Sequence, residues 1–461
     1  MIRISGGRVV DPANGVDRVT DLWLTDGKVA GIGEQPPAGW ADTKDAETLD
    51  ARGCVVCPGF IDPHMHEDPV GGDGRIRYGI FDCMLRMGVT TAVGGNCGSN
   101  AAHPAAYLDT VDRDGAPVNV ALLAGHGYFR YRAGARDKYA PATPEQRTAI
   151  RKMLREALDA GCAGISFGVR YQPGADGEEL LTAASAAEGT GKLIAAHVRN
   201  DAAYIFDAIR ETEALGRAFG LPVQISHIGS MGGFGQMRQV LADLDASRAA
   251  GLDTAMDCYP YEAFSTEIGS TTYDDGWLER YGCDYSVLEF CEGPWKGRRA
   301  AKEPFDAMRR DLPDSLTVCY VMRAGDVDMA LRHPMVAVAS DGILNDGQGH
   351  PRAAGTFPRF LSKYVREGGV PLSEGIRKMT ALPAARLGVP ARKGQLGIGA
   401  DADVTVFDPA VVRDRADFDS PTTAPEGIRY VVVGGRVAVR NGRVTDARCG
   451  RSVRVGNREA N

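Results

Sequence analysis

One apolar run of the chain ends in two histidines: Val55-Val56-Cys57-Pro58-Gly59-Phe60-Ile61-Asp62-Pro63-His64-Met65-His66. Residues 55–61 have the length and apolar character of a buried strand. His64 and His66 are two residues apart, so their side chains point to the same face of an extended backbone. Two imidazoles on one face can bind one metal ion together. This stretch therefore predicts a strand with a metal site at its carboxyl end.

Seven more apolar runs follow along the chain, with helical patterns between them. The clearest helical stretches are 144–160 and 203–219, and the first begins with Thr143 as N-cap and Gln146 at the capping-box position. Strands that alternate with helices indicate βα units and a parallel sheet. Eight such units predict an α/β fold, the (β/α)8 TIM barrel. The seven further strands are expected at 89–94, 118–124, 163–168, 193–196, 222–226, 253–258 and 335–339.

Polar residues of metal-ligand type follow the predicted strands. A TIM barrel places its chemistry at the carboxyl ends of its strands, so these side chains should share one pocket. Imidazole, thiolate and carboxylate are ligand types that suit zinc. The pattern predicts a hydrolase that activates water on a metal ion. The expected ligands are His64, His66, Cys97, His197, His227 and Asp341.

Two of these ligands have informative surroundings. Cys97 lies in Gly94-Gly95-Asn96-Cys97-Gly98, where the glycines permit a close approach of the backbone to a ligand or metal. Asp341 follows the eighth predicted strand. A carboxylate beside a metal ion can bind the metal and accept a proton from water, so Asp341 is the expected catalytic acid and base.

Two further residues are candidates for binding the substrate. Arg352 lies 11 residues beyond Asp341, and an arginine can bind a carboxylate through two parallel hydrogen bonds. A solvent-facing arginine is the alternative for this position. Tyr171 can donate a hydrogen bond to a polarised carbonyl oxygen, and a packing role is the alternative there.

Both ends of the chain have the pattern of short strands and turns. The runs at 8–10, 22–24 and 29–32 resemble those near 403–407 and 428–439. We therefore expect a small β-domain formed by residues 1–54 and 391–461. The barrel would occupy residues 55–390. An irregular insertion at about 265–334 would form a lid or binding loop over its mouth.

Composition limits the possible partners and the compartment. The chain has 461 residues, a net charge of −7 and a pI of about 5.7, which argues against nucleic acid and anionic membranes as partners. Neither a membrane-spanning run nor a signal peptide is visible in the sequence. Ten cysteines without a disulfide-like spacing suggest reduced thiols and a cytoplasmic location. A small-molecule substrate is expected, and the oligomeric state is not indicated.

Several motifs together resemble the amidohydrolase superfamily and, within it, the D-aminoacylases, which are N-acyl-D-amino-acid deacylases. The resemblance extends over nearly the whole chain. The first motif below and Pro58 to His66 are typical of the superfamily, and the others are more specific. The motifs include Gly7-Arg8-Val9-Val10-Asp11-Pro12, Gly94-Gly95-Asn96-Cys97-Gly98, His197-Val198-Arg199-Asn200, Asp257-Cys258-Tyr259-Pro260-Tyr261 and His350-Pro351-Arg352.

This resemblance implies a TIM barrel with a small β-sandwich, and zinc-dependent hydrolysis of the amide bond of N-acyl-D-amino acids. It implies a tightly bound zinc on Cys97, His197 and His227. A second, weaker metal position would use His64, His66 and Asp341. It also implies that Asp341 is the acid and base, that Arg352 binds the substrate carboxylate, and that Tyr171 helps to hold the substrate.

The chain departs from the family pattern after the sixth strand. Relatives often continue there as Ser-His-His-Lys, whereas this chain has Ser226-His227-Ile228-Gly229. A lysine at that position suits an acidic substrate side chain, so Gly229 calls specificity for N-acyl-D-glutamate or N-acyl-D-aspartate into question. The insertion after the seventh strand is also short, which predicts a different side-chain pocket.

Two other functions are alternatives. A cyclic-amide hydrolase would resemble dihydroorotases and hydantoinases, which usually carry a carboxylated lysine at the end of strand four. The fourth strand here, 163–168, contains no lysine. A non-catalytic assembly protein of the same fold is the second alternative, but such a chain would be expected to lose metal ligands.

Overall fold

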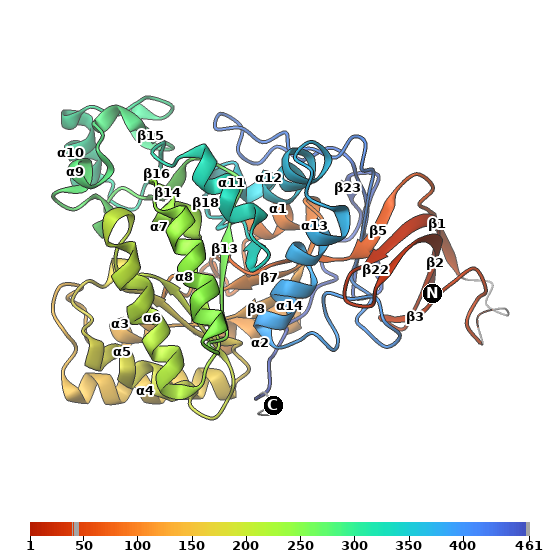
Figure 1. Cartoon of the computed structure of the whole chain (residues 1–461), viewed down its shortest axis with the longest axis horizontal. Coiled ribbons are helices and arrows are strands. Elements are labelled where there is room, and N and C mark those ends of the chain that lie inside the picture. The colour runs from red at the N-terminus through yellow and green to blue at the C-terminus, as the bar shows by residue number, and fades with distance from the viewer. Residues whose placement is uncertain (39, 41–45, 458–461) are drawn as a thin grey trace.

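Parallel strands in the middle of the chain form a barrel, which confirms the predicted TIM barrel (Figure 1). The computed structural model describes residues 1–38, 40 and 46–457. The third of the eight strand positions is occupied by β8 and β9 in succession, with a break at Leu123. The strands are β6 (Phe60–Asp62), β7 (Val89–Gly94), β8 (Asn119–Leu122), β9 (Ala124–Gly125), β10 (Gly164–Gly168), β11 (Leu193–His197), β12 (Val223–Ile225), β13 (Thr254–Cys258) and β17 (Val336–Val338).

The barrel closes where the chain beyond β17 meets the chain beyond β6. Met65 and Gly342 pair as parallel residues. The backbone N–H of Asp341 donates a hydrogen bond of 2.7 Å to the carbonyl oxygen of His64. This closure brings two of the expected metal ligands, from opposite ends of the barrel sequence, side by side.

Helices cover the outside of the barrel (Figure 1). The predicted helices at 144–160 and 203–219 are found as α4 (Pro144–Asp159) and α6 (Ile205–Phe219), and α4 has the expected capping box. None of the helices within the described ranges is both long and apolar enough to cross a membrane. The other helices around the barrel are α1 (Ile80–Arg86), α2 (Pro104–Asp114), α3 (His126–Arg132), α5 (Gly177–Ala184), α7 (Ile228–Gly232), α8 (Met237–Ala249), α11 (Ala324–Arg332), α12 (Arg352–Arg359), α13 (Leu372–Met379) and α14 (Ala381–Leu387).

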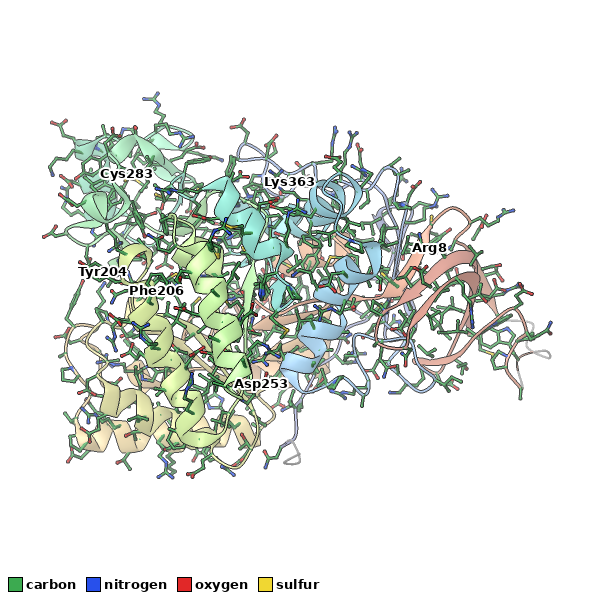
Figure 2. All side chains as sticks on the ribbon, in the orientation of Figure 1. Arg8, Tyr204, Phe206, Asp253, Cys283 and Lys363 are labelled. Carbon is green, nitrogen blue, oxygen red and sulfur yellow. The ribbon has the colours of Figure 1, made fainter. Side chains whose placement is uncertain are left out.

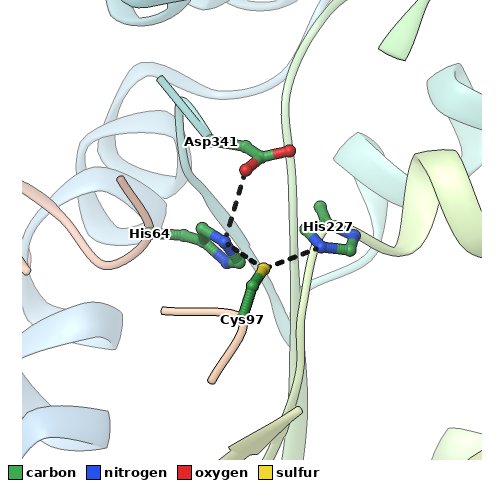
Figure 3. A group of neighbouring side chains, drawn as sticks. All are labelled: His64, Cys97, His227 and Asp341. Carbon is green, nitrogen blue, oxygen red and sulfur yellow. Dashed lines mark hydrogen bonds and ion pairs between the residues drawn. The ribbon is translucent and has the colours of Figure 1, made fainter. Parts of the chain in front are cut away.

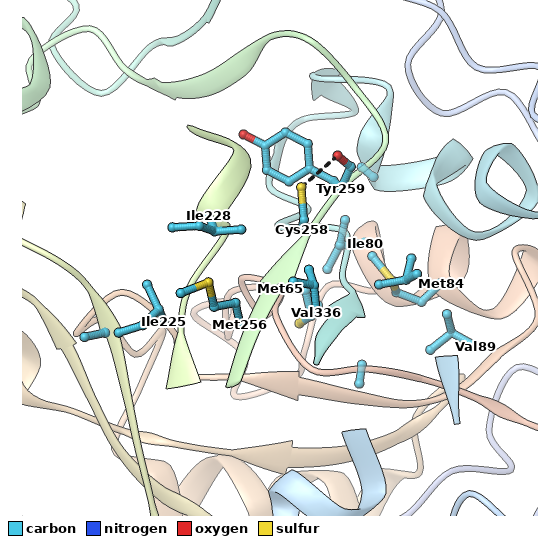
Figure 4. Packing of buried hydrophobic residues seen from close by; sticks show 14 of the residues in the cluster. Met65, Ile80, Met84, Val89, Ile225, Ile228, Met256, Cys258, Tyr259 and Val336 are labelled. Carbon is cyan, nitrogen blue, oxygen red and sulfur yellow. Dashed lines mark hydrogen bonds between the residues drawn. The ribbon is translucent and has the colours of Figure 1, made fainter. Parts of the chain in front are cut away.

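Apolar side chains from neighbouring strands fill the space between strands and helices. Ile225, Met256 and Val336 come from three adjacent strands and are fully buried (Figure 4). Full burial of such a side chain contributes about 1.5–3 kcal/mol. This packing supports the carboxyl ends of the strands, where the polar residues lie.

Nine strands from the two ends of the chain form one sheet, the β-sandwich domain beside the barrel. The sheet encloses a hydrophobic core of its own, which includes Leu22, Val56 and Val432. Its strands are β1 (Ile2–Asp11), β2 (Val16–Thr25), β3 (Lys28–Ile32), β4 (Glu47–Asp50), β5 (Val55–Pro58), β20 (Val404–Phe407), β21 (Ile428–Val433), β22 (Arg436–Arg440) and β23 (Arg443–Val444).

The predicted first barrel strand, 55–61, is two strands in two different sheets. β5 pairs with β1 and β20 in the small domain, and only β6 belongs to the barrel. The chain changes sheets at Gly59, where an added Cβ would lie 2.1 Å from Oγ1 of Thr90. Both halves of the run are buried, so apolar character alone does not separate them.

The expected domain boundaries therefore need two adjustments. Residues 55–58 belong to the sheet of the small domain, although they lie within the range 55–390 expected for the barrel. The end of the range 391–461 returns to the barrel, because Val453 donates a hydrogen bond to the Val120 carbonyl oxygen and Val455 donates to that of Gly161. Apart from these two segments, we propose residues 1–54 and 391–461 as the small domain and residues 55–390 as the barrel.

The insertion expected at about 265–334 is an ordered subdomain rather than an irregular loop. Three antiparallel strands form its sheet, in the order β14 (Phe264–Glu267), β16 (Leu316–Cys319), β15 (Leu288–Phe290). It also contains α9 (Trp277–Tyr281) and α10 (Lys302–Asp311), whereas α11 packs on the barrel. Cys283 of the insertion lies on the same side of the molecule as Tyr204, which precedes α6 (Figure 2).

Candidate active site

The six side chains that the sequence predicts as metal ligands meet at the carboxyl end of the barrel. Each follows or ends a different barrel strand, except for the two histidines beyond β6. In the order of the strands β6, β7, β11, β12 and β17, these residues are His64 with His66, Cys97, His197, His227 and Asp341.

Four of the side chains form a compact buried group (Figure 3). Ligand atoms of His64, Cys97, His227 and Asp341 all lie within 4.8 Å of one another. The Cys97 Sγ is 3.4 Å from Nε2 of His64 and 3.4 Å from Nε2 of His227. The Oδ1 of Asp341 is 3.4 Å from Nε2 of His64. Two imidazoles, a thiolate and a carboxylate at this spacing fit a zinc ion.

His66 and His197 lie at the edges of this group. The Nε2 of His66 is 3.3 Å from Oδ1 of Asp341, and the ring centroids of His197 and His227 are 4.5 Å apart. The Nδ1 of His197 is buried and has no hydrogen-bond partner among the described residues. A buried polar atom without a partner is unusual in a folded protein. The residues therefore form one continuous cluster suited to metal.

The charges around Cys97 and Asp341 favour their anionic forms. Burial raises the pKa of the Cys97 thiol, but the charges of His64 and His227 outweigh burial and leave this pKa well below its usual value. Burial also raises the pKa of Asp341, and the charges of Arg352, His227 and His64 bring it well below the usual range. Thiolate and carboxylate are the forms that bind metal.

Three of the predicted ligand residues have a strained backbone. Cys97, His227 and Asp341 have φ angles of 53°, 34° and 49°, in the left-handed region. Each non-glycine residue in such a conformation costs about 1–3 kcal/mol, and strain of this kind concentrates at functional sites.

Two side chains that the sequence analysis missed hold the loop of Cys97 in place. The backbone N–H of Gly98 donates to Oγ of Ser166 over 3.0 Å, and the same hydroxyl donates to the Gly95 carbonyl oxygen. The Glu67 carboxylate accepts a hydrogen bond of 2.6 Å from the Gly95 N–H. Ser166 lies in β10, the fourth strand, and its two hydrogen bonds connect that strand to the loop of Cys97. The sequence carried no signal for the role of either residue.

Asp257 and Ser230 orient two of the histidines. The Oδ1 of Asp257 accepts a 2.7 Å hydrogen bond from the backbone N–H of His227 and lies 3.4 Å from Nδ1 of His64. The Oγ of Ser230 is 3.0 Å from Nδ1 of His227. Partners of this kind fix the ring orientation of metal-binding histidines. Asp257 was visible in the sequence as a carboxylate within the predicted strand 253–258, four residues after Asp253.

Arg352, the predicted carboxylate-binding residue, is buried next to Asp341. Its Nη1 is 2.8 Å from Oδ2 of Asp341, and its Nη2 donates to the Ser265 carbonyl oxygen over 3.2 Å. The guanidinium also lies 4.7 Å from the ring centroid of Tyr259. The side chain is only 1% exposed, so the alternative of a solvent-facing arginine is wrong.

A cavity of about 600 Å³ opens over the cluster. Both predicted substrate-binding residues line it, Arg352 and Tyr171, together with Asp341. The ring of Tyr171 lies 4.5 Å from that of His197. A substrate in this cavity can therefore contact the metal ligands, the arginine and the tyrosine at the same time.

Gly229 does not line the cavity but lies buried in α7. A Cβ added there would meet Sγ of Cys258 at 2.9 Å and the Cε of Met322 at 3.0 Å. The absence of a side chain at this position is therefore explained by close packing against β13. In this chain, other residues must decide which substrate side chain is accepted.

The fold and the cluster define a metal-dependent hydrolase built on a TIM barrel. The sequence matches the model of the Amidohydrolase family over residues 47–192 and 170–439. An N-acyl-D-glutamate deacylase of Alcaligenes xylosoxydans xylosoxydans is 35% identical over 94% of this chain and 92% of the relative. A D-aminoacylase of the same organism is 34% identical over 94% of this chain and 93% of the relative.

A solved structure is similar over the whole length. The N-acyl-D-glutamate deacylase of Bordetella bronchiseptica, complexed with zinc and a phosphonate that mimics the tetrahedral intermediate, superposes with a TM-score of 0.86. It is 33% identical, and the match covers 98% of this chain and 99% of that one. The chain belongs to the amidohydrolase family.

Proposed function

We propose that this enzyme hydrolyses the amide bond of N-acyl-D-amino acids and releases a carboxylate and the free D-amino acid. The observation that carries the proposal is the arrangement within one cavity. A metal-binding cluster, a candidate acid and base, and a buried arginine for a carboxylate all line it. An N-acyl-amino acid presents an amide and a carboxylate at a short, fixed separation. The D-configuration is supported by the named activities of the relatives.

Zinc is the metal that the donor set fits best. Cys97, His197 and His227 would hold the tightly bound ion, and His64, His66 and Asp341 a weaker one. When bound, zinc supplies polarisation of the scissile carbonyl and increases the acidity of water. The close spacing of His64, Cys97, His227 and Asp341 supports a centre that both sets share.

Asp341 would transfer the proton during hydrolysis. As the water oxygen forms a bond to the carbonyl carbon, a carboxylate oxygen of Asp341 takes one proton from that water. When the C–N bond breaks, Asp341 gives this proton to the departing amine nitrogen. The low pKa of Asp341 keeps the side chain ionised, which is the form that can accept a proton.

Arg352 and Tyr171 would position the substrate. The guanidinium of Arg352 has donors that neither Asp341 nor Ser265 uses, and these can bind the α-carboxylate through a charge-assisted pair. The hydroxyl of Tyr171 can donate to the oxygen of the scissile carbonyl or to the carboxylate. With both ends fixed, the amide lies over the cluster.

The cyclic-amide alternative would need a bridging ligand from the fourth strand. That strand, β10, offers Ser166 instead, and the hydroxyl of Ser166 is occupied with the loop of Cys97. The assembly-protein alternative is disfavoured because all six expected ligands are present and converge. We also propose a cytoplasmic location, which the ten free cysteines support.

The test is a substrate panel with zinc-loaded protein. The panel pairs the N-acetyl and N-formyl derivatives of D-amino acids with those of L-amino acids, and adds dihydroorotate and hydantoin. Release of the free amine is measured directly. We expect turnover of D-derivatives and little of L-derivatives. Faster ring opening of the cyclic amides would overturn the proposal.

A further inference from the structure

The cavity wall contains two carboxylates that hydrolysis does not require. Glu267 and Asp314 both line the cavity, and neither forms an ion pair with any residue in the described parts of the chain. A third acidic residue, Asp201, also lines it, but it lies 2.9 Å from Nε of Arg280 and is neutralised there. Two carboxylates without an ion-pair partner therefore line the cavity above the cluster.

Strand β14 connects the arginine to one of these carboxylates. The carbonyl oxygen of Ser265 accepts the hydrogen bond from Arg352, and Glu267 lies two residues further along the same strand. Residues two apart in a strand share a face, and their separation is roughly 7 Å. The wall of the cavity therefore runs from the site for the substrate carboxylate to Glu267.

Glu267 lines the same cavity as Tyr171, and its charge acts on that tyrosine. Burial raises the pKa of Tyr171, the charge of Cys97 raises it further, and the charges of Asp341 and Glu267 also contribute. Burial likewise raises the pKa of Glu267, and the charge of Asp314 adds to this effect, whereas the charges of His66 and Lys138 act in the opposite direction. The charge of Asp314 therefore acts on Glu267, and the charge of Glu267 acts on Tyr171 beside the cluster.

The same region has buried polar atoms that need a partner. The Nε of Arg352 and the Oγ of Ser265 are buried and make no hydrogen bond to a residue that the structure describes. Such atoms are rare unless a ligand satisfies them. Arg352 is nearly fully buried and lines the cavity, so its free donor marks the position of an anionic group of the substrate.

We propose that the enzyme prefers N-acyl-D-amino acids with a cationic side chain, such as D-arginine and D-lysine, and that Glu267 and Asp314 bind this cation. The inference rests on the proposed deacylase function. With the α-carboxylate on Arg352 and the amide over the cluster, a long side chain extends along β14. Its cationic end then reaches the wall carboxylates, which repel the side chains of D-glutamate and D-aspartate.

Lys138 could favour an acidic substrate side chain instead of a cationic one. It also lines the cavity, with its Nζ 5.4 Å from the ring centroid of Tyr139. If Lys138 met the substrate side chain, an acidic substrate would be preferred instead. The excess of Glu267 and Asp314 over this one lysine favours a cation, and the experiment separates the two outcomes.

The experiment compares substrates of equal shape and different charge on the zinc-loaded full chain. N-acetyl-D-arginine is measured against N-acetyl-D-citrulline, and N-acetyl-D-glutamate against N-acetyl-D-glutamine. We expect kcat/KM to be about tenfold or more higher for the arginine derivative than for the citrulline derivative, the size of one hydrogen bond to a charged group. We expect the glutamate derivative to react more slowly than the glutamine derivative.

Variants of Glu267 and Asp314 test whether these two residues cause the preference for a cationic side chain. Glu267→Gln and Asp314→Asn should each reduce the ratio of kcat/KM for the arginine derivative to kcat/KM for the citrulline derivative. Asp275→Asn is the matched control, because this exposed aspartate lies in the same insertion but does not line the cavity. It should leave the preference unchanged.

Each outcome decides a different claim. Equal rates for arginine and citrulline derivatives, or faster hydrolysis of the glutamate than of the glutamine derivative, would overturn the inference while leaving the deacylase function intact. A preference that survives in both wall variants would show that other residues bind the cation. Absence of turnover with every N-acyl-D-amino acid would instead overturn the proposed function itself.

Discussion

The guanidinium of Arg352 and the carboxylate of Asp341 form a buried ion pair, with Nη1 2.8 Å from Oδ2. The residue proposed to bind the substrate carboxylate therefore touches the residue proposed to transfer the proton. In the proposed binding mode, the substrate carboxylate would lie beside Asp341, and the scissile amide would lie next to it. Removal of one partner from a buried pair leaves an uncompensated charge, which typically costs 3–5 kcal/mol.

Asp341→Asn should fold and lose nearly all turnover. An amide has a similar shape but cannot accept the proton from water, and acid–base groups contribute about 10²–10⁴-fold to the rate. Turnover of an N-acetyl-D-amino acid is measured together with circular dichroism and zinc content, which check that the variant is folded and loaded. A folded variant within a few-fold of the unaltered enzyme would assign proton transfer to another residue.

Arg352→Lys should lower kcat/KM on N-acyl-D-amino acids more than on matching amides that lack the carboxylate. Lysine keeps the charge but not the two-pronged geometry. Because Arg352 also contacts Asp341, some loss is expected with both kinds of substrate. The difference between the two losses measures recognition of the carboxylate. Equal losses would point to a purely structural arginine and would reopen the cyclic-amide alternative.

Ser166→Ala should weaken zinc retention about 10–100-fold, because its hydroxyl fastens the loop that carries Cys97. Competition with a chromophoric chelator measures the affinity. Ser185→Ala is the matched control, since that hydroxyl bonds the Thr182 carbonyl oxygen far from the cluster. Identical zinc affinities for the two variants would mean that the loop holds its position without Ser166.

Lys378 should make the stability of the fold depend on pH. Burial lowers the pKa of its amine to about 7 from a usual value of 10.5, and the amine donates a hydrogen bond to the His333 carbonyl oxygen. Between these two pKa values the unfolded chain binds more protons, so this group increases the free energy of unfolding as pH rises, by up to ~1.4 kcal/mol per pH unit. Below pH 7 the amine is protonated in both the folded and the unfolded chain, and its burial then lowers the free energy of unfolding by the full amount.

The measurement for Lys378 is urea unfolding of the enzyme and of Lys378→Met from pH 7 to pH 9.5. The difference in free energy between the two proteins removes the contributions of all other groups. It should change in favour of the unaltered enzyme as the pH rises. A constant difference over this range would mean that Lys378 titrates normally in the folded protein.

The barrel and the metal ligands could be predicted because they depend on local patterns. Seven of the eight predicted strands overlap single barrel positions, and β7 has the predicted bounds, Val89–Gly94. The metal-ligand residues could be predicted because each lies at or just after the end of an apolar run. The exception is 55–61, where β5 and β6 are both buried and apolar, so the crossing from one sheet to another at Gly59 left no break in the pattern.

The supporting contacts could not be predicted, because they join residues far apart in the sequence. Ser166 reaches Gly95 across 71 positions, and Asp257 binds the backbone of His227 across 30. The left-handed φ angle of Cys97 also contradicts the preference of that residue type. Such strain persists only because tertiary contacts hold it, so it has no local signal.

The central claim is that a zinc ion held by the Cys97 cluster drives hydrolysis of N-acyl-D-amino acids. The most direct test measures zinc content and amino-acid release on the same dialysed samples of the enzyme and of Cys97→Ala. We predict at least one zinc per chain in the enzyme, and loss of most zinc and most activity together in the variant. Full zinc occupancy in Cys97→Ala, or full activity of a metal-free enzyme, would contradict the account.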